Sequence, residues 1–212
     1  MPLASPGPRL GAAGLAVLLA LLAGCGGATP RVVRGDDDGM HGAVLTEQYT
    51  APDVDLTDTD GKPFSLSADT DKPLTLVFFG YTHCPDICPM TMANLASAMA
   101  RLDDGQRSRV DVVFVTTDPA RDDEATIRGW LDRFDPSFLG LTGDLGTIKQ
   151  LGKAFGVYIA QGRKLPSGGY EVTHGTPVVA IDADDRSPIV WTEGTSAADF
   201  ADDIATLLEE AP

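Results

Sequence analysis

Two cysteines that closely follow a continuous apolar segment constrain this chain more than any other feature. Leu74–Phe79 reads LTLVFF, and an unbroken apolar run of this length is typical of a strand buried on both faces. Cys84 and Cys88 come directly after it. Because ligand sites in α/β sheets lie at the carboxyl ends of the strands, the sequence predicts a site at which both thiols act.

The segments around this strand alternate between strand-like and helical patterns. Further strands are expected at Val110–Val115, Phe138–Leu141, Val157–Ile159, Tyr170–Val172, Val178–Ile181 and Ile189–Trp191, and helices over 89–104, 122–133, 144–154 and 196–209. A β-α-β unit followed by more helix and strand, a hairpin and a terminal helix is the element order of a thioredoxin-like fold. We therefore expect an α/β domain over residues 49–212, with a central mixed sheet flanked by helices.

Prolines restrict the backbone around the two thiols. Cys84 and Cys88 each precede a proline, which disfavours α conformation at both cysteines. Proline is well tolerated as the first residue of a helix, so we expect a helix that begins at about Pro89 with Cys88 as its N-cap. The partial positive charge there would lower the pKa of the Cys88 thiol and favour the thiolate, which is the form that binds metal.

Two thiols at this spacing can chelate a soft cation or close a small disulfide, and a bound metal would need another ligand. His83 is adjacent, but its side chain can point elsewhere. His174 lies far downstream, between two strand-like segments, in a turn that a thioredoxin-like fold brings beside the thiols. Pro177 is the candidate for the cis-proline of such folds. Residue type alone does not decide between Cu(I), Cu(II) and Zn(II). It also leaves open that His174 is a turn histidine with no ligand role.

The N-terminal segment is expected to be a targeting and anchoring device. Residues 10–23 form an apolar run that is shorter than the roughly 20 residues needed to span a bilayer, so residues 1–24 are interpreted as a signal peptide. Residues 22–25 read LAGC and resemble a bacterial lipobox, which would place a diacyl anchor on Cys25; an ordinary signal peptide is the alternative. Residues 25–48 are interpreted as a flexible tether, in which His41 is expected to be solvated.

The charge of the chain limits the kinds of partner it can bind, and its cysteines indicate the cellular compartment. The chain has 31 acidic and 16 basic residues, with a formal net charge of −15. Since a nucleic-acid-binding protein needs a basic surface, no nucleic-acid partner is expected. The predicted location is the extracytoplasmic face of the cell membrane. In that oxidising compartment Cys84 and Cys88, the pair left after lipidation of Cys25, would be oxidised to a disulfide, metallated or redox-active.

Four motifs resemble those of the SCO/SenC family of copper-binding assembly proteins, from about residue 50 to the C-terminus. The most specific is Gly80–Pro89, GYTHCPDICP, which matches the family's Cys-Pro-x-x-Cys-Pro signature; Thr117–Asp122, Phe138–Gly143 and Tyr170–His174 resemble three further motifs in the same order. The resemblance implies that Cys84, Cys88 and His174 bind copper, as Cu(I) or Cu(II). It also implies delivery of that copper to the binuclear copper site of cytochrome c oxidase subunit II, so subunit II is the expected partner.

The sequence departs from the family pattern near the histidine. Gly175 follows His174 where the family often has Ser or Thr, and residues 182–185 replace a Pro-Asp-Gly turn. Both departures concern the turn geometry more than the predicted ligands.

Other side chains near the motifs either take part in the site or pack in the core and turns. Asp118 either tunes a thiol and orients His174 or forms a turn before a proline. Met90 and Met92 are expected to pack in the core rather than to bind metal. Phe78, Phe79 and Tyr81 are interpreted as core and as the wall of the site.

A thiol–disulfide oxidoreductase is the main alternative function. Cys84 or Cys88 would then reduce client cysteines through a mixed disulfide. The three-residue gap between the cysteines, where most thioredoxin-like reductases have two residues, and the presence of His174 favour the metal site. A peroxidase is less favoured because no cysteine is marked as peroxidatic, and a combined reductase and copper carrier stays open. We therefore expect a metallochaperone rather than an enzyme.

Overall fold

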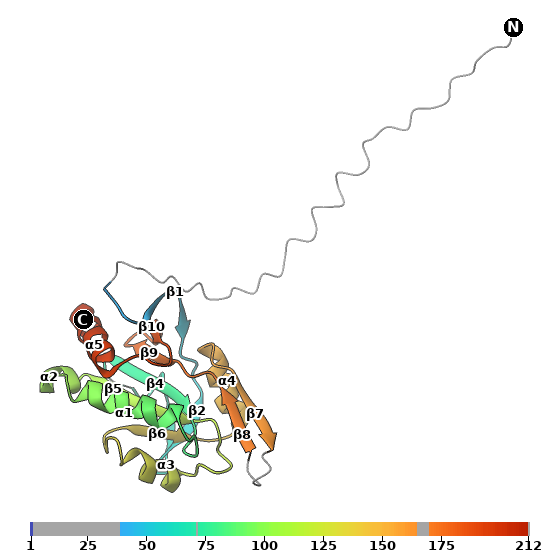
Figure 1. The fold of residues 1–212 in the computed structure, drawn as a ribbon, viewed down its shortest axis with the longest axis horizontal. Helices are drawn as coiled ribbons and strands as arrows, with labels where there is room; N and C mark the ends of the chain where they lie inside the picture. Colours follow the sequence, from blue (N-terminus) through green and yellow to red (C-terminus); the bar gives the residue numbers. More distant parts are fainter. Residues whose placement is uncertain (2–38, 71, 165–169, 212) are drawn as a thin grey trace.

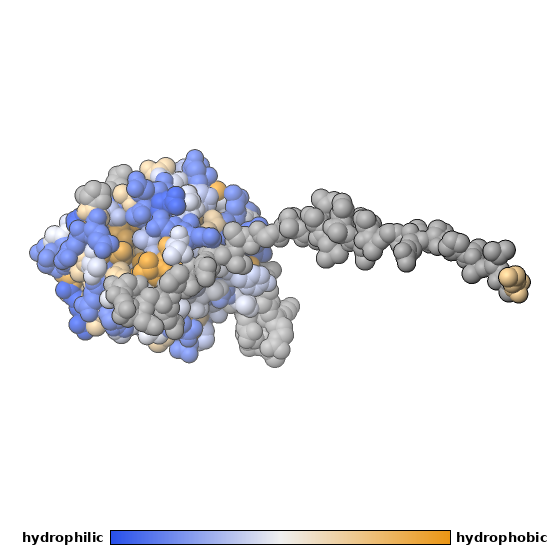
Figure 2. Space-filling view, turned by 90° about the horizontal axis from the view of Figure 1, so that it is seen from above, coloured by the Kyte–Doolittle hydropathy of each residue, from blue (hydrophilic) through white to orange (hydrophobic). Residues whose placement is uncertain are grey.

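The computed structural model describes Met1 and residues 39–70, 72–164 and 170–211. The predicted signal peptide, the predicted lipidation site at Cys25 and most of the predicted tether lie outside these residues. Among the described residues no helix combines the length and apolar character needed to cross a membrane. One face of the domain, shown in Figure 2, is mostly hydrophilic, with hydrophobic residues in small areas.

Three parallel strands form the centre of the fold. They are β4 (Leu74–Gly80), β5 (Val110–Thr116) and β6 (Leu139–Thr142), and each pairs with the next in parallel register. Every residue of β4 is buried, as the apolar run predicted. The carboxyl ends of these strands meet at one edge of the sheet, which is where both cysteines follow.

Five further strands complete an eight-stranded mixed sheet, in the order β1-β10-β9-β4-β5-β6-β2-β3. The added strands are β1 (Ala43–Thr50), β2 (Asp55–Asp58), β3 (Pro63–Ser65), β9 (Val178–Asp182) and β10 (Arg186–Trp191). All five run antiparallel to their neighbours. A separate antiparallel hairpin is formed by β7 (Ile159–Lys164) and β8 (Tyr170–His174).

Helices cover both faces of the sheet (Figure 1). The buried residues of α1 (Ile87–Met99), α3 (Glu124–Leu131) and α5 (Ala197–Glu210) share one hydrophobic core with alternate residues of β4 and β5. Those of α4 (Leu145–Ala154) share a second core with the other residues of the same strands and with the start of β7. A short helix, α2 (Asp104–Arg107), follows α1. The predicted fold class, a thioredoxin-like mixed sheet flanked by helices, is confirmed.

The N-terminal boundary of the domain differs from the expectation. Strand β1 pairs with β10 from Ala43 onward, so the fold begins before residue 49. The backbone N–H groups of His41 and Gly42 donate to the buried carboxylate of Asp203 on α5, at 2.8–3.1 Å. The indole N–H of Trp191 donates to the same carboxylate at 2.6 Å. These bonds fix His41 and Gly42, which belong to the predicted tether, to the domain.

Candidate metal centre

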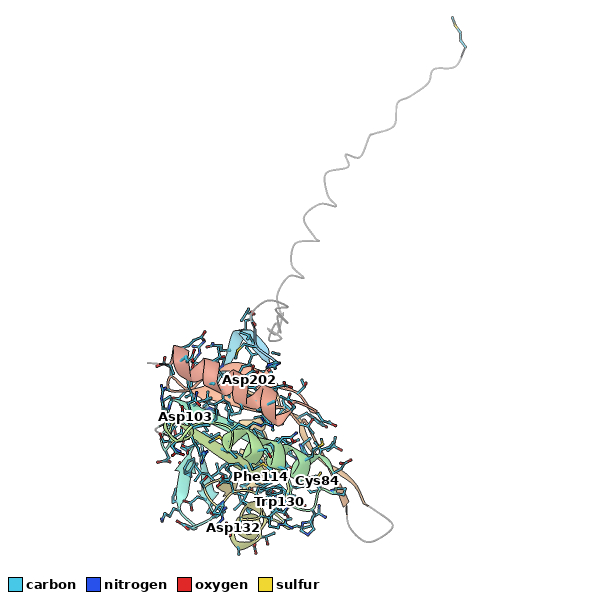
Figure 3. All side chains as sticks on the ribbon, turned by 60° about the vertical axis from the view of Figure 1, so that its left-hand side comes forward. Cys84, Asp103, Phe114, Trp130, Asp132 and Asp202 are labelled. Carbon is cyan, nitrogen blue, oxygen red and sulfur yellow. The ribbon has the colours of Figure 1, made fainter. Side chains whose placement is uncertain are left out.

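The Cys84 thiol lies on the loop after β4, close to the start of α1 (Figure 3), and the Cys88 thiol lies in the first turn of α1. This helix begins at Ile87, with Asp86 in the N-cap position, so the expected start at Pro89 and the expected N-cap at Cys88 were wrong. A proline is tolerated at Pro89 because N–H groups in the first turn have no intrahelical acceptor. Its ring meets no helical carbonyl, since the residue four positions earlier precedes the helix.

The backbone N–H groups at the start of α1 lower the pKa of Cys84 rather than that of Cys88. The Asp86 side chain makes no capping hydrogen bond. The Cys88 thiol and backbone N–H groups of residues 86–88 donate to the Cys84 sulfur, and these bonds lower the pKa of Cys84 to about 5 although its partial burial opposes the shift. Cys84 is therefore a thiolate at neutral pH, in the environment that sequence reasoning assigned to Cys88.

Cys88 keeps its proton. Its side chain is fully buried, and its pKa is raised because its proton is donated to Cys84 and because burial disfavours the charged form. Neither cysteine forms a disulfide in this structure. The pair thus holds a single proton between two sulfurs, with the negative charge on the more accessible one.

His174 is the last residue of β8 and reaches the buried sulfur. Its Nε2 lies 3.8 Å from the Sγ of Cys88. Its Nδ1 lies 2.8 Å from the carbonyl oxygen of Gly175; since a carbonyl only accepts hydrogen bonds, Nδ1 carries the proton. This tautomer leaves the lone pair of Nε2 facing the thiol, and a backbone acceptor on the far nitrogen is the usual support of a metal-binding imidazole.

Aromatic rings enclose the histidine. Tyr81 and Phe78 meet the His174 ring edge-on, with centroid distances of 5.8 and 6.4 Å. Burial and the neighbouring sulfurs of Cys84 and Cys88 raise the pKa of Tyr81 to about 12. The phenol therefore stays protonated at neutral pH and is hydrogen-bonded to the Cys84 sulfur. The expectation that Tyr81 walls the site is in keeping with these contacts.

Gly80 provides the space that Cys88 needs beneath the loop. A Cβ at this position would lie 3.0 Å from the Cys88 sulfur and 2.9 Å from the rings of both Phe78 and Phe114. Real Cβ atoms rarely approach other heavy atoms so closely. The absence of a side chain at the end of β4 thus lets the buried thiol pack against the sheet.

Asp118 is linked to the centre through other side chains. It is buried and forms an ion pair with Arg121, whose guanidinium lies 5.9 Å from the centroid of the Tyr81 ring. Tyr81 in turn contacts His174. A role of Asp118 in orienting the histidine would therefore act through Arg121 and Tyr81.

A second carboxylate, Asp122, was missed by the sequence reasoning. It is fully buried and accepts hydrogen bonds from the backbone N–H of Thr82 (2.9 Å), the hydroxyl of Thr82 (2.6 Å) and the hydroxyl of Thr116 (2.7 Å). These bonds fasten the loop that carries the thiols to the end of β5. The charge of Asp122 also contributes to the raised pKa of Cys88.

The other two histidines have acidic neighbours. His83 is about half exposed, and its Nδ1 lies 3.5 Å from Asp122 and 3.0 Å from the Thr82 hydroxyl, so its side chain is turned toward the β5 loop. His41 lies beside α5, 3.6 Å from Asp199. The structure thus brings His174, but neither His83 nor His41, against a thiol.

Two further expectations can be compared with the structure. Met92 is fully buried in the core, as expected, but Met90 is 40% exposed, so the prediction that it packs in the core was wrong. The helix turns Met90 outward because it lies two positions before the inward-facing Met92. No peptide bond in the described segments is cis, so the bond before Pro177 is trans and the expected cis-proline is not found.

The three predicted ligands are close to one another only two at a time. Cys84 is hydrogen-bonded to Cys88, and Cys88 is close to His174, but within the described part of the chain no three His, Cys, Asp or Glu side chains already form a group that could hold a metal ion. Two sulfurs and one imidazole nitrogen are nevertheless a donor set that suits soft or borderline ions such as Cu(I), Cu(II) and Zn(II). The chemistry of the site fits copper, and a closer approach of the ligands would complete it.

Comparison with known proteins gives a consistent result. A family model described as SCO1/SenC matches residues 43–209. The chain is 35% identical over 128 residues to mitochondrial protein SCO2 of Saccharomyces cerevisiae, covering 60% of this chain and 42% of that protein. It is 30% identical over 141 residues to a putative copper-binding protein of Stutzerimonas stutzeri, covering 66% and 68%. The chain thus spans less than half the length of the yeast relative.

Solved structures of similar proteins share the fold. Apo Sco1 from Thermus thermophilus has a TM-score of 0.72 and 30% identity, covering 82% of this chain and 99% of that one. ScoI from Bradyrhizobium japonicum with copper bound has a TM-score of 0.67 and 29% identity, covering 74% and 99%. Yeast Sco1 with copper bound has a TM-score of 0.70 and 26% identity, covering 77% and 91%.

Proposed function

Because this chain belongs to the SCO1/SenC family, we propose that it binds copper and delivers it to the binuclear copper site of cytochrome c oxidase subunit II. The relative from Stutzerimonas stutzeri is named as a putative copper-binding protein, and two similar structures contain copper. The recipient is the one that the motif resemblance implies. Copper is the cargo in this proposal, not a permanent cofactor.

The proposed ligands are Cys84, Cys88 and His174. The observation that carries the assignment is the approach of His174 Nε2 to within 3.8 Å of the Cys88 sulfur, between residues on different elements. The proton on Nδ1, held by the Gly175 carbonyl, leaves Nε2 free to bind. Cys84 is ionised and only partly buried, so it is the sulfur that a copper-carrying partner can reach first, and ligand exchange between partners requires such access.

The proposed location is the extracytoplasmic face of the cell membrane, with the chain anchored through a diacyl group on Cys25. The LAGC sequence at residues 22–25 and the preceding apolar run support this location. A diacyl anchor provides the two chains that stable membrane attachment requires. It would keep the copper centre near a membrane-embedded recipient.

Copper transfer to subunit II tests the proposal. The copper-loaded chain is mixed with the copper-free soluble domain of subunit II, the two proteins are separated, and the copper in each is measured. We expect copper to move to the subunit II domain. Copper that stays with the chain under conditions in which both proteins remain folded would contradict delivery.

A thiol–disulfide oxidoreductase is the second candidate, and the ionised Cys84 beside a buried, protonated Cys88 favours it. The Cys84 thiolate would attack a client disulfide, forming a mixed disulfide and releasing one client thiolate. Cys88, after losing its proton to water or buffer, would then attack the Cys84 sulfur. The products are a Cys84–Cys88 disulfide and a second client thiolate, so the client gains two electrons.

His174 separates the two candidates because only copper binding requires it. Under the copper proposal, His174→Ala loses transfer to the subunit II domain. Under the oxidoreductase alternative, the same variant still reduces an oxidised subunit II domain at the rate of the unmodified chain, while Cys84→Ser does not.

A further inference from the structure

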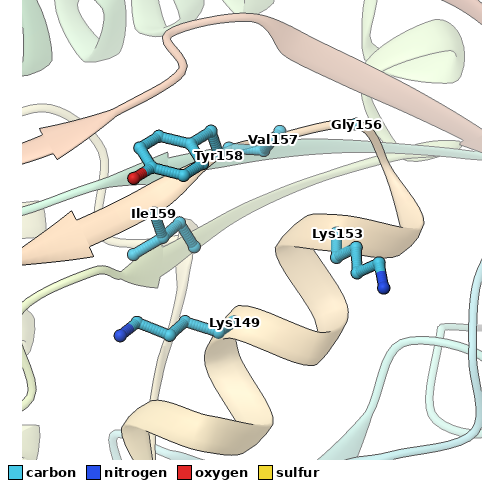
Figure 4. A pocket seen from close by; sticks show the side chains of 6 residues that line it. All are labelled: Lys149, Lys153, Gly156, Val157, Tyr158 and Ile159. Carbon is cyan, nitrogen blue, oxygen red and sulfur yellow. The ribbon is translucent and has the colours of Figure 1, made fainter.

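A groove runs between α4 and the segment that leads into β7. We define the α4–β7 groove by its lining residues, which are Lys149, Lys153, Gly156, Val157, Tyr158 and Ile159. Its volume is about 350 Å³, which is within the range of small binding pockets. Figure 4 shows both lysines projecting from α4, with the ring of Tyr158 on the neighbouring strand segment.

This groove is directly connected to the proposed metal centre. Its lining residue Ile159 is paired with His174 in the β7–β8 hairpin, and directly opposite residues of an antiparallel pair lie close together. The carbonyl of Tyr158 accepts a hydrogen bond of 2.9 Å from the N–H of Gly175. The residues that line the groove therefore also hold the histidine in place.

The α4–β7 groove is cationic although the chain is strongly acidic. Lys149 and Lys153 are exposed and lie one helical turn apart, so they share a face of α4. Neither forms an ion pair within the described residues, whereas Lys62 pairs with Asp60 and Lys72 with Asp111. In a chain of net charge −15, two lysines that have no acidic partner among the described side chains form a local site for negative charge beside the groove.

Tyr158 adds an aromatic contact surface to this site. Its side chain is 68% exposed, and Met90 is the other exposed large hydrophobic residue of the described domain. Exposed aromatic residues next to pockets are frequent anchors in protein–protein interfaces. The exposed tyrosine, the two exposed lysines and the apolar groove together fit a protein surface that has carboxylates beside an apolar side chain.

We propose that the α4–β7 groove docks the protein that receives copper, through acidic side chains on Lys149 and Lys153 and an apolar side chain beside Tyr158. This inference rests on the proposed function, because it identifies the surface that brings the recipient to His174. An anionic membrane is a less suitable occupant. Lipid-binding surfaces typically use about four to eight basic residues, whereas only Lys149 and Lys153 among the lining residues of the groove are basic.

Charge reversal in the groove tests this inference. The probe is the copper-free soluble domain of subunit II, and its dissociation constant from the full chain is measured by calorimetry at low and at high salt. We expect Lys149→Glu with Lys153→Glu to weaken binding by about tenfold or more at low salt, and Tyr158→Ala to weaken it at both salt concentrations. The control is Lys62→Glu with Arg101→Glu, which changes the net charge equally on exposed residues outside the groove.

The outcomes separate this inference from the proposed function. Equal dissociation constants for the groove variant and the control variant would overturn the docking site, as would absence of any binding by the unmodified chain. Copper content after desalting is measured for every variant, and loss of copper from the unmodified chain would count against the proposed function instead. Binding to phosphatidylglycerol vesicles that the groove variant loses would overturn a protein occupant in favour of lipid.

Discussion

Substituting alanine for Gly80 tests whether the buried thiol depends on the empty space at the end of β4. The added Cβ would lie 2.9 Å from the rings of Phe78 and Phe114 and 3.0 Å from the Cys88 sulfur. Both rings are fully buried, so neither can move without disturbing the core. Cys88 has the smallest side chain of the three neighbours, so we expect its sulfur to shift away from the sheet.

The cost of this substitution follows from the packing. Inserting a methyl group into a closely packed core typically destabilises a protein by about 1–3 kcal/mol. For a chain of this size, 1 kcal/mol corresponds to a change in Tm of about 2–4 °C. Gly80→Ala should therefore lower the Tm by roughly 2–12 °C, and because the Cys88 sulfur moves, it should also weaken copper binding.

Gly129 provides the matched control for this prediction. It lies within α3, and a Cβ there would meet no atom within 4 Å. Alanine is a better helix former than glycine by about 1 kcal/mol, so Gly129→Ala should raise the Tm by a few degrees and leave copper binding unchanged. Thermal unfolding and copper titration of both variants are the assays. A Gly80→Ala protein with unchanged Tm and unchanged copper affinity would refute the packing argument.

Three other substitutions have predicted outcomes. Cys88→Ala removes the strongest donor to the Cys84 sulfur, so the pKa of Cys84 should rise from about 5 toward about 8.5. Since only the thiolate reacts, alkylation by iodoacetamide at pH 6 should slow about tenfold or more; an unchanged pH profile would contradict the shared proton. Asp122→Asn weakens three hydrogen bonds to a buried carboxylate and should lower the free energy of unfolding by about 2–4 kcal/mol in urea. Asp203→Ala leaves the Trp191 indole N–H without its acceptor and should cost about 3 kcal/mol or more by the same assay.

The centre of the fold could be predicted because its signals are local and strong. β4 is an apolar run, and β5 is apolar from Val112 to Val115 with Asp111 as its one charged residue; both strands are buried on both faces. The strands β2 and β3 read DLTD and PFS and have no such run, because they lie at the edge of the sheet. The pairing of β2 with β3 and with β6 depends on tertiary contacts that no local pattern reveals.

The three side chains that the sequence singles out as ligands lie close to one another in pairs, but the sequence did not predict which thiol is ionised. Proline geometry could not distinguish the first helical position from the third, since N–H groups are unpaired at both, so the low pKa was assigned to Cys88 instead of Cys84. The missed carboxylate has a similar cause. Asp118, Asp122 and Asp123 are close in sequence, and which of them caps α3 or faces the loop depends on the turn; Asp123 is the N-cap and Asp122 points inward.

Copper titration of the reduced chain tests whether Cys84, Cys88 and His174 form a copper site. A full-length chain carrying Cys25→Ser has Cys84 and Cys88 as its only thiols, so sulfur-to-copper charge-transfer absorption under argon reports on these two alone. We predict a saturable signal at one copper per chain that is lost in Cys84→Ser and Cys88→Ser and weakened or lost in His174→Ala. Rapid disulfide formation with no Cu(II) retained, and no Cu(I) bound in a parallel titration, would contradict it.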